Sequence, residues 1–193
     1  MKLLNACLLT LFILAGGQTA LSQTKKPSPR SKSTSTKSTS TKSYPNAKTQ
    51  ANQLNDAILA GDYEKAADLT YPKLVQLIGG RAKYLEVLKS SMNEMQPGSF
   101  QIMSTVAGEA RDVIEVGADV YAILPTTMKI KVPEGVLVGE SAMIGVSKDR
   151  GEHWTFIDVG SGLNEQQLKT LFPAVAGRLK VPEQKRPVLQ QGP

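Results

Sequence analysis

The sequence predicts an α+β protein with N-terminal helices packed on a curved antiparallel sheet and disordered tails on both sides of this domain. Apolar residues recur at spacings of three and four from Ala47 onward, as they do on the buried side of a helix. Beyond Gln96 the period changes to two, and glycine and proline turns divide the alternating region into strands. The 193 residues, 40% of them hydrophobic, are enough for one domain with a core.

Two helices are predicted at the start of the domain. Pro45 suits the first turn of the first helix, and Gly61 can end it. Asp62 can cap a shorter second helix, which the pair Tyr71-Pro72 breaks. One face of each helix is apolar: Ala47, Ala51, Leu54 and Ile58 in the first, and Tyr63, Ala66 and Leu69 in the second.

A short apolar segment and a third helix come next. Residues 72–78 fit either a helix or a strand, and Gly79 with Gly80 ends them. The third helix is predicted from Arg81 to Gln96, before a Pro-Gly pair. Its expected buried stripe consists of Tyr84, Leu88, Met92 and Met95.

Five alternating stretches predict the strands: 99–107, 113–116, 119–132, 136–147 and 152–159. Pro125 interrupts the longest of them, which predicts a bend, a bulge or an edge position there. Turns at 133–135 and 148–151 join the last three strands into hairpins. A final helix is expected after Asn164, whose side chain can form a capping box with Gln167.

This order of elements resembles the nuclear-transport-factor-2-like (NTF2-like, or SnoaL-like) cone fold. The resemblance covers roughly Ala47 to Val159, and it rests on the element order and on the step Gly79-Gly80 into the third helix. The hairpin that the family usually places before that helix is shortened here to 72–78. Another α+β sandwich, or a cystatin-like sheet wrapped on one helix, fits the same pattern. The resemblance implies a cavity at the opening of the sheet. In this superfamily the opening serves one of three uses: it binds a small apolar ligand, it is the active site for isomerisation or hydration, or it forms a dimer face.

Residues 1–22 have the features of a secretory signal peptide. Lys2 precedes a run of twelve mostly apolar residues, and small and polar residues then lead to a cleavage site between Ser22 and Gln23. The run is too short for a transmembrane anchor, which needs about 20 apolar residues. We therefore expect an exported protein that is periplasmic or secreted after cleavage.

Residues 23–43 and 176–193 are predicted to be disordered on either side of a domain at 44–175. The first is a linker rich in Lys, Ser and Thr, and the second is a flexible C-terminal tail. Residues 44–173 contain 12 basic and 16 acidic side chains, so the net charge of +6 belongs to the termini. We expect no nucleic-acid binding by the domain, whereas the cationic linker can attract anionic envelope polymers weakly.

One local motif matches the Ser-x-Asp-x-Gly-x-x-Trp box of sialidase-type propellers, with Ser147, Asp149, Gly151 and Trp154 at its fixed positions. Asp149 can accept hydrogen bonds from amides of its own turn, and Gly151 can adopt a positive φ. Propellers repeat the box in blade after blade, and it occurs once here, so the sequence excludes a propeller. We interpret the box as a structural hairpin turn and not as a sugar-binding site.

Few residues suit catalysis or metal binding. The chain has one His and one Cys, and Cys7 lies inside the signal, so we expect no metal site and no cofactor. Asp158 could abstract protons if its strand face, shared with Trp154 and Phe156, lines a cavity. His153 is a weaker candidate base, because a histidine beside a turn is commonly exposed. The candidate pocket-lining residues are Tyr84, Tyr121, Trp154 and Asp158.

The sequence favours a non-enzymatic domain that binds a small apolar molecule or a partner protein, because its apolar sheet carries few convergent ionisable groups. One alternative is an acid/base isomerase or dehydratase that uses a cavity carboxylate. Another is an envelope-associated protein that its cationic linker retains. A homodimer is compatible with each of these functions.

Overall fold

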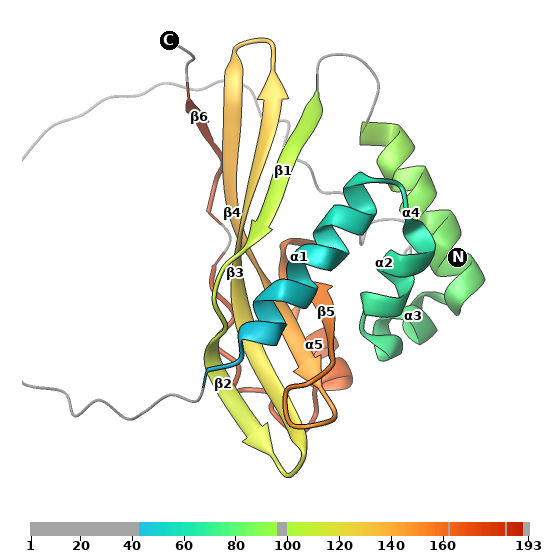
Figure 1. Ribbon diagram of the computed structural model, residues 1–193, viewed down its shortest axis with the longest axis vertical. Coiled ribbons are helices and arrows are strands. Elements are labelled where there is room, and N and C mark those ends of the chain that lie inside the picture. The colour runs from blue at the N-terminus through green and yellow to red at the C-terminus, as the bar shows by residue number, and fades with distance from the viewer. Residues whose placement is uncertain (1–42, 96–99, 162, 184, 191–193) are drawn as a thin grey trace, which may run out of the picture. The chain divides into compact units, whose positions relative to one another are not determined.

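Figure 1 shows a computed structural model of the chain, which describes residues 43–95, 100–161, 163–183 and 185–190. The predicted signal peptide at 1–22 and the linker at 23–43, apart from Ser43, lie outside these residues. The described part has five α-helices and a curled antiparallel sheet, which confirms the predicted α+β class.

Four helices come first in the chain: α1 (Pro45–Leu59), α2 (Tyr63–Leu69), α3 (Pro72–Ile78) and α4 (Arg81–Met95). The Asp62 side chain caps α2 by accepting a hydrogen bond from the Lys65 amide. The segment 72–78, which fitted a helix or a strand, is a helix, and Gly79 ends it with φ +113°. Three of the predicted stripe residues of α4 are buried: Tyr84, Leu88 and Met92.

The sheet contains six strands: β1 (Gln101–Ala107), β2 (Arg111–Val116), β3 (Asp119–Val132), β4 (Gly135–Ser147), β5 (Trp154–Asp158) and β6 (Val188–Gln190). The long hairpin of β3 and β4 forms its centre. β1 and β2 pair with successive parts of β3, while β5 and β6 pair with opposite ends of β4. The first two strands therefore form one side of the sheet, and the last two form the other.

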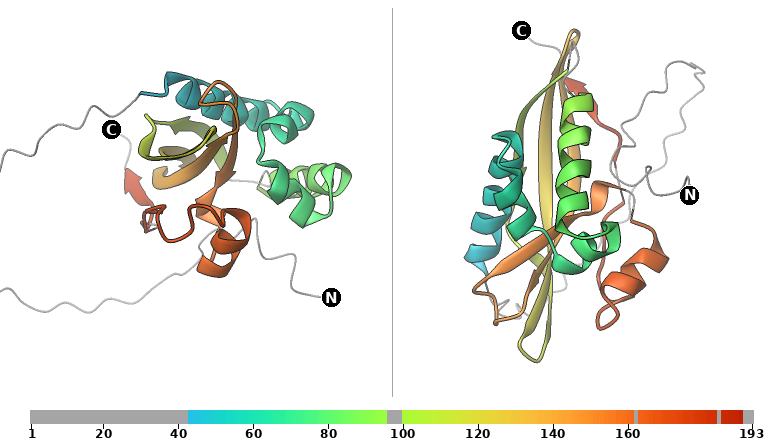
Figure 2. Two further views of the ribbon diagram at one scale, coloured as in Figure 1. Left: turned by 90° about the horizontal axis from the view of Figure 1, so that it is seen from below. Right: turned by 90° about the vertical axis from the view of Figure 1, so that its right-hand side faces the viewer.

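Each face of the sheet is covered by its own core. One face carries the helix-side core. In it, Ala122 and Leu124 of β3 and Trp154 and Phe156 of β5 pack against residues of α1, α2 and α4. Ile123 points to the opposite face, which carries the C-terminal-side core. Helix α5 (Glu165–Leu171) and the chain after it cover this core. Figure 2 shows these two sets of elements on different sides of the sheet.

Helix α1 closes the curled sheet by bonding to both of its sides. The Asn52 side chain accepts a hydrogen bond from the Ala107 amide at 2.8 Å and donates one to the Ala107 carbonyl at 3.3 Å. Gln50 accepts a bond from the Trp154 amide at 2.8 Å and donates one to the Glu152 carbonyl at 2.7 Å. Two amide side chains thus satisfy backbone groups that have no neighbouring strand. Seen from below, α1 runs along the open side of the curl (Figure 2, left).

The C-terminal region differs from the flexible tail predicted for 176–193. Asn164 and Gln167 form the predicted capping box of α5, and the chain then packs on the C-terminal-side core. It ends in β6, which pairs with residues 136–138 of β4. The prediction of a flexible tail is wrong for these residues, because apolar side chains without a regular period anchor the segment: Val175, Leu179 and Val181.

Candidate functional site

Three of the predicted pocket residues are divided between the two cores. Tyr84 is 6% exposed and Trp154 is 1% exposed, and both belong to the helix-side core. The Tyr84 hydroxyl lies 2.9 Å from the Thr70 hydroxyl, and burial raises the pKa of Tyr84. Tyr121 belongs to the C-terminal-side core, where its ring meets Phe172 edge-on. Tyr121 therefore faces away from the other two and does not share an opening with them.

Asp158, the fourth predicted residue, is half-buried at the end of β5. It pairs with Met143 of β4, so its side chain shares the helix-side face with Trp154, as predicted. Its Oδ1 accepts hydrogen bonds from the Gly160 amide at 2.7 Å and from the Ser141 hydroxyl at 3.3 Å. Desolvation raises the pKa of the Asp158 carboxyl, and these two bonds oppose the rise.

The free energy of unfolding is expected to depend on pH through Asp158. Because its pKa is raised in the folded protein, its contribution is full below the ordinary aspartate pKa and is lost as the pH rises through the folded value. Asp158→Asn resembles the protonated carboxyl and keeps an Oδ1 acceptor. The stability of this variant relative to the wild type should therefore increase over the pH range above the ordinary aspartate pKa of about 4. Urea unfolding of both proteins across this range measures the difference, and a difference that stays constant with pH contradicts the prediction.

The loop from Ser147 to Trp154 forms the hairpin turn that its motif predicts. The Ser147 hydroxyl accepts a hydrogen bond from the Gly151 amide at 2.8 Å, and Asp149 Oδ1 accepts one from the His153 amide at 2.9 Å. Gly151 has φ +97°, and its carbonyl accepts a bond from the Trp154 indole at 2.9 Å. The fixed positions of the motif thus bond to one another and hold the turn.

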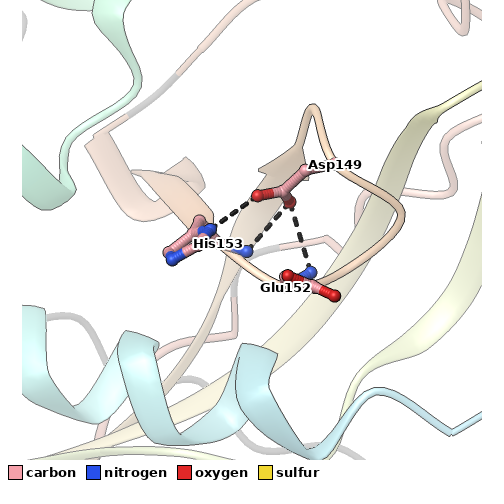
Figure 3. Close-up of side chains that lie close together, drawn as sticks. All are labelled: Asp149, Glu152 and His153. Carbon is pink, nitrogen blue, oxygen red and sulfur yellow. Dashed lines mark hydrogen bonds and ion pairs between the residues drawn. The ribbon is translucent and has the colours of Figure 1, made fainter.

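Three potential metal ligands meet in the same loop (Figure 3). Ligand atoms of Asp149, Glu152 and His153 lie within 4.8 Å of one another. The amide and the ring of His153 lower the pKa of the Asp149 carboxyl, and that carboxyl raises the pKa of His153. The sequence search missed this group because it looked for several His or Cys donors. The His153 side chain is 84% exposed and bonds to Asp149 at 2.6 Å, so we assign the pair to turn stabilisation.

An open cleft of about 550 Å³ lies against the sheet, lined by parts of β2, β3 and β4, by residues after β5, and by residues 180–185 except 184. Its volume falls in the usual range of small-molecule sites, about 300–1,000 Å³. The main apolar lining residues are Ile123, Pro125, Ala142, Val159, Leu163 and Val181. The four predicted pocket residues are not among those that line it.

The rest of the lining is polar and carries both signs of charge. Arg111 and Lys180 supply cations, and no ion pair within the described residues reaches either of them. Asp112 and Glu183 supply carboxylates that are likewise outside the described ion pairs. Four charged groups are therefore available to a ligand. The hydroxyl groups of the lining are Thr126, Thr127 and Ser141.

Two local features shape the cleft. In β2 the pairing with β3 shifts between Arg111 and Ile114, and Asp112 at this bulge has φ +47°. Bulges and positive φ values outside glycine often occur beside functional sites. On the C-terminal segment, Lys185 forms an ion pair of 2.8 Å with Glu140, which helps to hold the segment beside β4.

Sequence reasoning missed this cleft because it assigned residues 176–193 to a tail. The residues that complete the lining, such as Lys180 and Glu183, lie in this segment, for which the sequence predicts no helix or strand. The available signal was the spacing of the apolar residues Val175, Leu179 and Val181, which pack in the C-terminal-side core.

No family model matches the chain, and neither does any curated protein or solved structure. The resemblance to the NTF2-like superfamily therefore stays a prediction. Of the helices in the described residues, none is long and apolar enough to cross a membrane.

Proposed function

We propose that the domain is a non-enzymatic binding module that takes a small amphipathic molecule into the cleft. The observation that supports the proposal is the lining, in which apolar side chains from several elements lie beside six charged and three hydroxyl side chains. Small-molecule sites commonly combine an apolar surface, which supplies affinity, with a small number of polar groups that set orientation.

The lining also indicates the chemistry of the ligand. An apolar ring laid against Ile123 and Val181 would be removed from water, which stabilises the complex by about 25 cal/mol per Å² of apolar surface. Three cationic and three anionic side chains line the cleft, so it has no net charge. Binding should therefore depend weakly on salt.

An acid/base enzyme has less support than a binding module. Asp158, the carboxylate best suited to that role, is not among the lining residues of the cleft. Its Oδ1 accepts hydrogen bonds from Gly160 and Ser141, which gives the side chain a role at the end of β5.

The fluorescent dye anilinonaphthalene sulfonate tests the proposed site, because it joins an apolar ring system to one anionic group. We expect the full chain to bind the dye while its near-UV circular dichroism stays that of a folded protein. Thr127→Trp places an indole in the cleft and should weaken binding about tenfold or more.

Lys129→Trp is the matched control, since Lys129 is exposed two residues further along β3 and does not line the cleft. This variant should bind the dye as the wild type does. If the two tryptophan variants weaken binding equally, or if the wild type does not bind, the proposal fails.

We also propose that the protein acts outside the cytoplasm, because residues 1–22 have the three regions of a signal peptide. N-terminal sequencing of the protein recovered from outside the cytoplasm should begin at Gln23. Recovery of only the uncleaved chain, inside the cell, would contradict this location.

A further inference from the structure

We propose that the outer edge of β1 pairs antiparallel with the same edge of a second copy of this chain. This open edge runs from Gln101 to Val106, on the side of β1 that faces away from β3. The proposal does not depend on the ligand cleft.

The other outer strands carry protection that residues 101–106 of β1 lack, because Asn52 of α1 bonds only to Ala107 of this strand. β2 bears charged residues, among them Arg111 and Glu115, and Pro187 directly precedes β6. Two backbone groups of β5 have partners outside the sheet. The Trp154 amide donates a hydrogen bond to the Gln50 side chain, and the Phe156 carbonyl accepts one from the Tyr71 amide at 2.9 Å. Charged side chains, prolines and covering segments are the means by which proteins prevent pairing between sheet edges.

β1 has no charged residue and no proline, and its apolar side chains are unusually exposed. Met103 and Val106 are each 53% exposed, and the adjacent Phe100 is 47% exposed. An uncharged edge strand with exposed apolar side chains is a favourable template for another strand.

The backbone of β1 offers hydrogen-bonding groups on this edge. Asn52 bonds to both backbone groups of Ala107, so Ala107 presents its N–H and C=O away from β3. Because residues two apart along a strand present these groups to the same side, Thr105 offers the next pair. No backbone hydrogen bond on this side of Thr105 occurs within the described residues.

A second copy suits this edge because an uncharged strand can lie antiparallel to itself without placing like charges opposite each other. Exposed side chains such as Met103 and Val106 would become buried in the contact.

The geometry also limits the assembly to two chains. Each copy uses the same edge, so the contact is two-fold symmetric and closes without leaving a second open edge of this kind. The bulge between Ile102 and Ser104 shortens the regular part of the strand. We therefore expect a weak, reversible dimer with a micromolar dissociation constant.

Sedimentation velocity of the full chain over increasing concentration tests the proposal. The average mass should rise from that of one chain towards that of two. Val106→Lys places a charge on each copy of the pairing edge and should raise the dissociation constant about tenfold or more. Val188→Lys is the matched control, because Val188 is 64% exposed on β6 and should leave the dissociation constant unchanged.

A second variant tests the backbone part of the contact. Thr105→Pro removes the outward N–H and should also give monomers, while circular dichroism checks that the domain is folded. The proposal is overturned if the wild type stays at the mass of one chain. It is also overturned if both lysine variants change the dissociation constant equally, or if Val106→Lys or a folded Thr105→Pro dimerises like the wild type.

Discussion

Trp154→Ala is expected to lower the free energy of unfolding by about 3–5 kcal/mol. Trp154 is 1% exposed, and its ring meets Tyr44 edge-on at a centroid distance of 5.6 Å. Gly145 lies so close that a Cβ on it would be 3.0 Å from the indole, which shows how tightly the ring is enclosed. Removing the ring leaves a cavity in the helix-side core and deletes the bond to the Gly151 carbonyl.

Urea unfolding followed by circular dichroism measures this loss, since the chain has no second tryptophan to report by fluorescence. Trp154→Phe is the control, because it keeps an aromatic ring and removes only part of the contact, so its loss should be smaller. An alanine variant within about 1 kcal/mol of the wild type would show that the turn and the core do not depend on this side chain.

Gly151→Ala should lower the free energy of unfolding by about 2–5 kcal/mol, for two separate reasons. Its φ of +97° is unfavourable for a residue with a Cβ. A Cβ at this position would also overlap the ring of Tyr44, which packs against Trp154 and so has little room to move.

Gly117→Ala separates the two effects. Gly117 has φ +66° in the turn between β2 and β3, and a Cβ there would meet no atom within 4 Å. Gly117→Ala should therefore lower the free energy of unfolding through its backbone conformation alone, by about 1–2 kcal/mol. Chemical unfolding measures the free energy of unfolding of both variants. If both variants lose the same amount, the Tyr44 ring moves aside without an energetic penalty, and the predicted overlap is contradicted.

Local signals in the sequence predicted much of the fold. The change of period after α4, the Asp62 cap and the capping box of Asn164 and Gln167 each depend on residues close in the chain, and each is present. The contacts of Gln50 and Asn52 could not be predicted, because they join α1 to strands that lie far along the chain and their partners are backbone groups.

The candidate site was harder to predict than the fold. Alternation along a strand shows which residues share a face, and Asp158 does share one with Trp154. The alternation does not show which face is packed with side chains and which face borders a cleft. Tyr121 has the opposite parity to Ala122 and points to the other core, while the cleft depends on a C-terminal segment without a regular period.

Amide chemical shifts of the full chain during titration with anilinonaphthalene sulfonate test the central claim most directly, because they locate the bound ligand residue by residue. Our account predicts the largest changes at cleft residues such as Thr127, Ser141 and Val181, with the amides of Tyr84 and Trp154 little changed. Largest changes at Tyr84 and Trp154 would place the ligand in the helix-side core and contradict the account.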